Sequence, residues 1–147
     1  MNVFFDAPKM QKVASDQGLV SLIRSPLAMG LLTGKYDTTT RMPAKDIRAS
    51  QEDWMEYFLD GKANPEFMQT LDTVRELLTT DGRTLVQGAL GWLWAHGDTI
   101  IPVPGARTVK QIEGITASLE FGAVSEDVRA EIETLIERKP QEPDRPR

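Results

Sequence analysis

Only two segments of this 147-residue sequence have the pattern of β-strands, and this shortage limits the folds open to it. Residues 19–23 lie between Gly18 and a Ser-Pro pair, and residues 99–101 follow Gly97. Helical patterns separate the two segments, so the strands should lie parallel and be joined by helical crossovers. Two parallel strands cannot cover their own edges. The sequence therefore predicts an α/β protein whose ligand loops are part of a larger site.

The other apolar residues recur at helical spacing, and several helices have clear start signals. Asn64-Pro65-Glu66 supplies an N-cap, a proline at the first helical position and an acidic first turn. The apolar stripe that follows consists of Phe67, Leu71, Val74 and Leu78. Further helices are predicted at about 7–16, after Thr84, after Thr108, and from Ser125 to Arg138-Lys139-Pro140. An apolar cluster within residues 54–59 predicts one more short helix.

Two glycines, Gly88 and Gly91, lie inside the helix that follows Thr84. Each costs roughly 1 kcal/mol relative to alanine in a helix interior. We therefore predict that another backbone approaches this helix closely.

Composition limits the classes of function. The net charge is −5 with acids and bases mixed, so no basic stripe is available for nucleic acid. Cysteine is absent, which excludes disulfides and thiolate catalysis and fits a reducing compartment such as the cytoplasm. No run approaches the roughly 20 apolar residues of a membrane span, so no membrane association is expected. Residues 1–140 are predicted to form one unit, followed by a polar tail at 141–147.

The sequence gives little support for a metal site or for a serine hydrolase. The only histidine, His96, closes a helix before Gly97, where a partner of the helix dipole is favoured over a catalytic group. Without a second histidine or a cysteine, no zinc site is expected. Ser25 lacks the Gly-x-Ser-x-Gly elbow of many serine hydrolases. Trp92 and Trp94 lie on a helix and are interpreted as packing residues.

The first candidate ligand loop, residues 25–36, follows the first strand and contains two glycines and Lys35. It does not match a P-loop, because three residues separate its glycines where four are needed and Tyr36 follows the lysine. Two interpretations remain open. In one, the loop is a turn with a solvated lysine. In the other, Ser25, the backbone near Leu27 and Lys35 face a pyrophosphate at the carboxyl end of a strand.

The second candidate loop, residues 101–111, leads from a strand into a helix N-terminus. The free N–H groups and dipole of such a terminus favour an anion, and Arg107 could add a bidentate phosphate contact. Thr108-Val109-Lys110-Gln111 also fits a capping box, in which Gln111 would only bond the backbone of its own helix. Both interpretations remain open.

Together these residues resemble the carboxyl-terminal part of an aldo-keto reductase, over about residues 1–138. The most specific string is Ser-Pro-Leu-x-x-Gly-x-Leu-x-Gly-Lys-Tyr at 25–36. Matching segments resemble the end of the barrel's sixth strand (2–4), its seventh strand and following loop (18–36), its eighth strand and adenosine-phosphate loop (101–111), Glu120-Phe121-Gly122, and the last helix.

The resemblance implies an incomplete (β/α)8 TIM barrel that binds NAD(P)H across its carboxyl end. In that family, a Tyr, Lys, Asp and His group protonates a carbonyl as hydride arrives. The residues implied to line the pyrophosphate are Ser25, Pro26, Leu27, Gly30 and Lys35, with Arg48 from the following loop as a further candidate. Those implied to hold the adenosine end are Gly105, Arg107 and Gln111. Arg107 would contact a 2′-phosphate, so the expected cofactor is NADP.

The sequence departs from the family pattern at three points. Arg24 stands where an aromatic residue usually stacks on the nicotinamide, so only its guanidinium could stack there. Gly114 and Ile115 stand where the family often has Glu and Asn that read the adenine. The catalytic tetrad and the first strands are not recognisable, so no catalytic residue is predicted.

Two hypotheses of function follow. The first is a truncated aldo-keto reductase-like protein that carries the NADP-binding end of a carbonyl oxidoreductase, with a small-molecule carbonyl as substrate, and that is inactive alone. The second is a non-enzymatic binding or assembly module whose strand edges and apolar helix faces associate with a second copy or a complementing chain. A chain that never folds cooperatively is a third interpretation.

Overall fold

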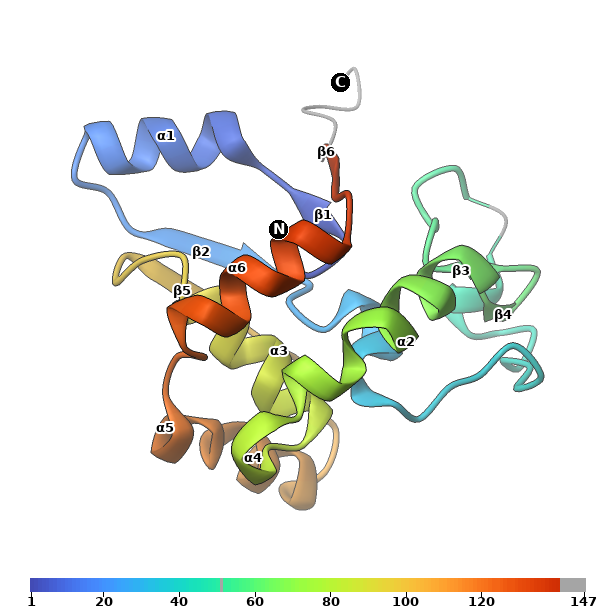
Figure 1. Cartoon of the computed structure of the whole chain (residues 1–147). Coiled ribbons are helices and arrows are strands. Elements are labelled where there is room, and N and C mark those ends of the chain that lie inside the picture. Colours follow the sequence, from blue (N-terminus) through green and yellow to red (C-terminus); the bar gives the residue numbers. More distant parts are fainter. Residues whose placement is uncertain (51, 141–147) are drawn as a thin grey trace.

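The computed structural model describes residues 1–50 and 52–140 as an α/β protein (Figure 1). Its helices are α1 (Pro8–Asp16), α2 (Pro65–Leu78), α3 (Leu85–Trp94), α4 (Val109–Thr116), α5 (Ser118–Phe121) and α6 (Glu126–Leu135). Its strands are β1 (Phe5–Asp6), β2 (Ser21–Arg24), β3 (Phe58–Leu59), β4 (Lys62–Ala63), β5 (Ile100–Val103) and β6 (Lys139–Pro140). Short 3-10 segments lie at Ala28–Thr33, Ile47–Ala49 and Thr80–Gly82. The predicted tail, 141–147, lies outside the described residues.

Strands β2 and β5 form a parallel pair, as the sequence predicts. Their register runs from Ser21 opposite Ile100 to Arg24 opposite Val103, so both strands end at the same level. The loops that begin at Ser25 and Pro104 therefore leave the same edge of the sheet. The first strand begins at Ser21 rather than Leu19, because residues 19 and 20 lie outside the paired segment.

Segment 54–59 is not a helix, which corrects the sequence-based prediction. Phe58 and Leu59 pair antiparallel with Lys62–Ala63 in a short hairpin. Asp60 and Gly61, with φ of 49° and 74°, form the turn between the two strands. Two left-handed residues match the twist of a hairpin, and Asp-Gly is a strong signal for this turn. The apolar residues of the segment thus alternate between faces, with Phe58 buried and Leu59 exposed.

Strands β1 and β6 pair in parallel across almost the whole described chain, with Phe5 opposite Lys139. Each has only two residues, so neither has a strand pattern in the sequence. The last helix correspondingly ends at Leu135, earlier than predicted, because the chain then extends toward β1.

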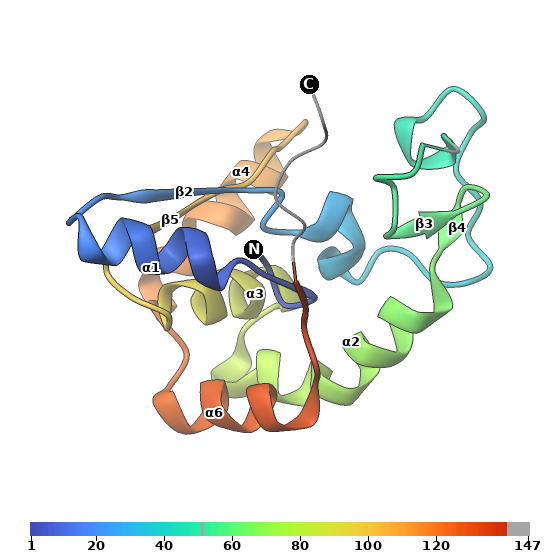
Figure 2. The ribbon, with the colours of Figure 1, turned by 90° about the horizontal axis from the view of Figure 1, so that it is seen from above.

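Helix α3 forms the centre of the core. Figure 2 shows it between the β2–β5 sheet and α6. Eight of its ten residues are buried, including Trp92, which has no exposed surface. A Cβ atom added to Gly88 would lie 1.7 Å from the carbonyl oxygen of Leu78, and one added to Gly91 would lie 2.8 Å from that of Gly122. The predicted close approach of other backbones is confirmed.

Helix α2 packs on α3 and α6 through its predicted stripe, which is entirely buried. The N-caps predicted at Asn64, Thr84, Thr108 and Ser125 all accept a hydrogen bond from their helix backbone. These helices begin where predicted, because each N-cap depends on residues two or three positions apart.

One face of the β2–β5 sheet is uncovered. Ile23 and Ile100 are buried on the face toward α3, whereas Leu22 is 69% exposed and Ile101 46% exposed on the other. Within the described residues, β2 and β5 pair only with each other. No helix in the described part of the chain is long and apolar enough to cross a lipid bilayer.

Candidate functional site

The loop after β2 has an unusual backbone. Ser25, Ala28 and Met29 have φ of 54°, 50° and 54°, and Gly30 has φ of 96°. Non-glycine residues seldom adopt this left-handed region, and such strained residues cluster at functional sites. The loop is held by hydrogen bonds from Ala28 N to Ser25 O at 3.1 Å and from Gly30 N to Leu27 O at 2.8 Å.

Buried residues fill the middle of this loop and exposed residues lie at its two ends. Its anchors are the buried side chains of Pro26, Leu27, Ala28, Leu31 and Leu32. Ser25 and Lys35, by contrast, are exposed. The sequence-based assignment of five residues to this loop therefore divides into two buried anchors, a glycine and two accessible polar residues.

Gly30 makes room for a cationic cluster. A Cβ atom at this position would lie 3.2 Å from the Tyr36 ring and 3.7 Å from Nη1 of Arg48. The Arg48 guanidinium stacks 4.9 Å from the centroid of the Tyr36 ring, and Nζ of Lys35 lies 5.6 Å from the same centroid. Gly30, Lys35 and Arg48 are thus brought together around one aromatic ring, although Arg48 lies 13 or more positions further along the sequence.

Arg48 is fixed by Asp46. Its Nε lies 2.8 Å from Oδ1 of Asp46 and its Nη2 lies 2.6 Å from Oδ2, and Nη1 also bonds the Tyr36 hydroxyl. These bonds raise the pKa of Arg48 and hold the pKa of Asp46 at about 2. The charge of Arg107 adds a smaller lowering of the pKa of Asp46. The charge of Arg107, from the second loop, therefore reaches the Asp46 carboxylate that holds Arg48.

The second loop forms the predicted capping box. Oε1 of Gln111 accepts the N–H groups of Arg107 at 2.8 Å and Thr108 at 3.2 Å, and the Thr108 hydroxyl accepts the Gln111 N–H. The capping interpretation of Gln111 is confirmed. Gly105, Arg107 and Gln111 are all exposed, so the side chain of Arg107 is accessible beside the helix N-terminus.

Arg24, at the end of β2, is exposed, and its charge reaches the hydroxyl of Tyr57, a residue without a predicted role. Burial raises the pKa of the Tyr57 hydroxyl, and the charge of Arg24 acts in the opposite direction. Tyr57 also bonds Asn2, which is 2% exposed. Neither residue has a local sequence signal, because their contacts join segments 55 positions apart.

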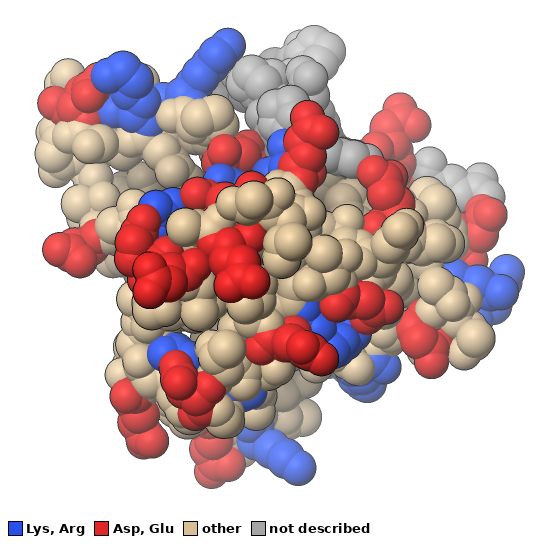
Figure 3. Space-filling view, in the orientation of Figure 1, with Lys and Arg blue, Asp and Glu red and all other residues tan. Residues whose placement is uncertain are grey.

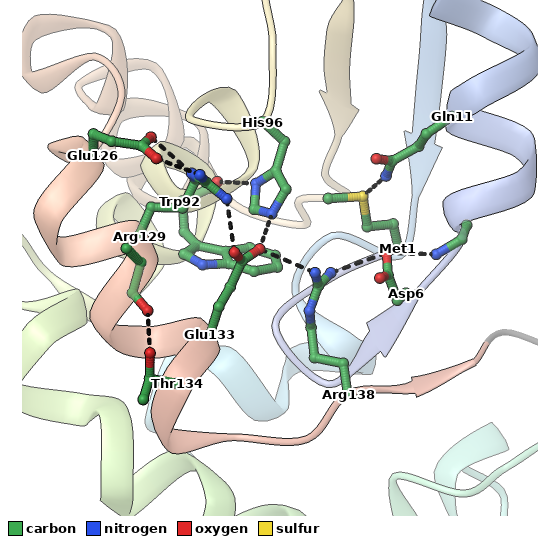
Figure 4. A network of polar contacts seen from close by, with 12 residues as sticks. Met1, Asp6, Gln11, Trp92, His96, Glu126, Arg129, Glu133, Thr134 and Arg138 are labelled. Atoms are coloured by element: carbon green, nitrogen blue, oxygen red, sulfur yellow. Dashed lines mark hydrogen bonds and ion pairs between the residues drawn. The ribbon is translucent and has the colours of Figure 1, made fainter.

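His96 belongs to a separate polar network, between α3, α6 and β1 (Figure 4). Its Nδ1 lies 2.8 Å from the Trp92 carbonyl oxygen in the last turn of α3, and its Nε2 lies 3.1 Å from Glu133. Arg138 joins Glu133 to Asp6, each at 3.1 Å, and stacks on the Trp92 ring. These contacts agree with a partner of the helix end, and the burial of Trp92 agrees with a packing role.

The charged side chains of the face in Figure 3 form no single-sign patch of Lys and Arg. On the face in Figure 3, acidic and basic side chains are interspersed without a continuous basic surface. Among residues 1–50 and 52–140, no group of three or more His, Cys, Asp or Glu side chains could hold a metal ion. The common end of β2 and β5 and the strained backbone of the loop after β2 make the loops at this edge of the sheet the candidate site.

Two parallel strands that end together in a strained loop and in an arginine-bearing helix N-terminus define an α/β protein with its candidate ligand loops at one edge of the sheet. The chain belongs to the Aldo/keto reductase family, whose sequence model matches residues 1–137.

Similar proteins include an NADP(+) aldo-keto reductase of Schizosaccharomyces pombe, 28% identical over 71% of this chain and 29% of that protein. An aldo-keto reductase of Strobilurus tenacellus is 26% identical over 81% of this chain and 34% of that protein. A chloroplastic pyridoxal reductase of Arabidopsis thaliana is 23% identical over 90% of this chain and 33% of that protein. The chain thus spans about a third of the length of these relatives.

Proposed function

We propose that this chain carries the NADP-binding end of an NAD(P)H-dependent carbonyl oxidoreductase, with β2 and β5 as neighbouring strands of an incomplete (β/α)8 barrel. The observation that carries the proposal is the common end of the two strands, which brings the loops at 25–35 and 104–111 to one edge. Membership of an oxidoreductase family supports it. The S. pombe relative, named as an NADP(+) enzyme, supports the choice of cofactor.

In this proposal, the first loop receives the pyrophosphate. Ser25, Gly30 and the backbone at Pro26 and Leu27 line it, and Lys35 supplies a mobile positive charge. Arg48 is a poorer direct ligand than Lys35, because its Nε and Nη2 already bond Asp46. Its role is to fix Tyr36 and the loop beside Gly30.

The second loop receives the adenosine end. Arg107 binds the 2′-phosphate, since its guanidinium is exposed next to the N-terminus of α4. Gly105 leaves open space for the cofactor, since no atom lies within 4 Å of a Cβ built there. Gln111 acts on the cofactor through the loop that it caps, because its carbonyl oxygen is already bonded to the backbone.

The bound cofactor would supply hydride to a small-molecule carbonyl. The proposal assigns no catalytic residue to this chain. Arg24, in the position usually held by a stacking aromatic, would contact the nicotinamide end through its guanidinium. A cytoplasmic location agrees with the absence of cysteine and remains part of the proposal.

A titration with NADPH and NADH, followed by tryptophan fluorescence, tests the function. Arg107→Ala should weaken NADPH binding by about 10- to 100-fold, the value of a lost charge-assisted contact, and should leave NADH binding unchanged. Lys110→Ala, which removes an exposed cation three positions further on, in the first turn of α4, is the matched control. Equal effects of the two substitutions would contradict the 2′-phosphate contact. Absence of binding to either cofactor by the unchanged chain would contradict the proposed function.

A second candidate function is an assembly module, favoured by the uncovered face of the β2–β5 sheet. Leu22, Ile101 and Val103 together expose an apolar surface beside unpaired strand edges of the described structure. Sedimentation velocity distinguishes the outcomes. An oligomer that dissociates in Leu22→Glu would support a second copy on this face, and a monomer at all concentrations would contradict self-association.

A further inference from the structure

A single buried side chain, Asn2, connects three separate segments at the edge of the candidate site. Its Oδ1 accepts the N–H groups of Phe4 at 2.9 Å and Phe5 at 3.2 Å. Its Nδ2 donates to the backbone oxygen of Ser25 at 3.2 Å and to the Tyr57 hydroxyl at 2.8 Å. The residue is 2% exposed.

The partners fix the orientation of this amide. Two N–H donors face one terminal atom, which must be the oxygen, and a carbonyl oxygen faces the other, which must be the NH2 group. Both hydrogens and both lone-pair directions of the side chain are then used. No other terminal group of the same size satisfies all four contacts, because a carboxylate cannot donate to the Ser25 carbonyl.

The Ser25 carbonyl belongs to a strained residue. Ser25 has φ of 54°, a conformation that serine seldom adopts, and this turn redirects the chain from β2 into the loop. The same oxygen accepts the N–H of Ala28 at 3.1 Å, and Ala28 is also in the left-handed region, with φ of 50°. The Asn2 amide therefore acts on the first bond of the loop's own hydrogen-bond chain.

We propose that Asn2 is a positioning residue, whose amide holds the Ser25 backbone in its left-handed conformation and thereby shapes the pyrophosphate loop. The inference rests on the proposed function for its effect on the cofactor. Its structural part, the dependence of Ser25 on Asn2, stands independently. Tyr57 shares the Nδ2 group but bonds a separate hydrogen, so its loss leaves the contact to Ser25 in place.

The test is Asn2→Asp, which preserves size and the acceptor for Phe4 and Phe5. The new carboxylate can still accept a hydrogen from the Tyr57 hydroxyl, but it repels the Ser25 carbonyl. The first measurement is the backbone conformation of Ser25, from its Cα and Cβ chemical shifts and its amide coupling constant. We expect Ser25 to leave the left-handed region. The second is NADPH affinity, which we expect to fall about tenfold, the effect of one lost buried hydrogen bond.

Two controls separate positioning from general stability. Tyr57→Phe removes the other acceptor of Nδ2, and we expect the Ser25 conformation to remain and NADPH affinity to change less than twofold. Val74→Ala makes a cavity in α2, where Val74 has no exposed surface, and lowers stability without touching the loop. If Asn2→Asp does not fold, Asn2→Ser replaces it, since a serine hydroxyl can accept from N–H groups two or three positions on but is too short to bridge to Ser25.

The outcomes distinguish the two proposals. If the unchanged chain binds no NADPH, the proposed function fails, and the Ser25 conformation alone decides the role of Asn2. Retention of the left-handed conformation in Asn2→Asp or Asn2→Ser would overturn the inference. A loss of NADPH affinity in Val74→Ala equal to that in Asn2→Asp would also overturn it.

Discussion

Gly88→Ala adds one methyl group at the glycine that another backbone approaches most closely among the glycines of the described structure. The new Cβ would lie 1.7 Å from the Leu78 carbonyl oxygen and 2.6 Å from its carbon. Neither atom can rotate away, because both belong to the backbone at the end of α2. Relief requires α2 and α3 to separate by more than about 1 Å, since carbon and oxygen atoms ordinarily pack at roughly 3.3 Å or more.

This separation would loosen the centre of the core. Overpacking typically costs about 1–3 kcal/mol, and a clash with backbone belongs at or above the upper end of that range. Alanine recovers about 1 kcal/mol of helix propensity. We expect a net loss of about 2–3 kcal/mol in the free energy of unfolding, which lowers Tm by about 4–12 °C for a chain of this size.

Gly114→Ala is the matched control in α4, because a Cβ atom there meets nothing within 4 Å. We expect it to stabilise the protein by about 0.5–1 kcal/mol through helix propensity alone. Urea unfolding and thermal unfolding, followed by circular dichroism, measure both variants. If Gly88→Ala is as stable as the unchanged protein while Gly114→Ala behaves as expected, the close approach of α2 to α3 is wrong.

Three further predictions concern stability and charge. The pKa of Asp46 is about 2 in the folded protein, against 3.8 for an aspartate without these partners. Its bonds to Arg48 therefore stabilise the fold above about pH 4, and this stabilisation is lost as the pH falls toward 2. The difference in unfolding free energy between the unchanged protein and Asp46→Asn should therefore disappear over that interval of pH, and a constant difference would contradict the ion pair. Ile23→Ala should cost about 2–4 kcal/mol in urea unfolding, whereas Leu22→Ala should cost less than about 0.5 kcal/mol, because these neighbours lie on opposite faces of β2 and only Ile23 is buried. Arg83→Lys should lower Tm. Arg83 is 8% exposed, and its two terminal nitrogens donate to the three carbonyls of residues 121–123 in a fork that lysine cannot reproduce. An unchanged Tm would show that these bonds do not contribute to stability.

Much of the helical structure is predictable from the sequence, and the reason is local. The caps at Asn64, Thr84 and Thr108 each use atoms two or three residues apart, and the stripe of α2 repeats at the period of the helix. The hairpin at 58–63 could also have been predicted, because Asp60-Gly61 is a turn signal. The apolar residues at 54–59 have the spacing of a short helical stripe, and for this reason the prediction of a helix there is wrong.

For the candidate site, the sequence identifies the two loops and their cations. It does not reveal that Arg48 is bonded to Asp46 and stacked on Tyr36, or that Gly30 makes the space for this cluster. The capping of Gln111 is one of two interpretations that the sequence leaves open; the hydrogen bonds of the folded loop confirm the cap, and the phosphate contact stays a prediction.

The sequence by itself therefore determined where the main helices start, the two parallel strands and the family, because these depend on short spacings and on a specific string of loop residues. Only the tertiary structure decided the β1–β6 pair, the uncovered face of the sheet and the four contacts of Asn2. These features join residues up to 134 positions apart. A two-residue strand or a single asparagine has no local sequence pattern from which its partner could be predicted.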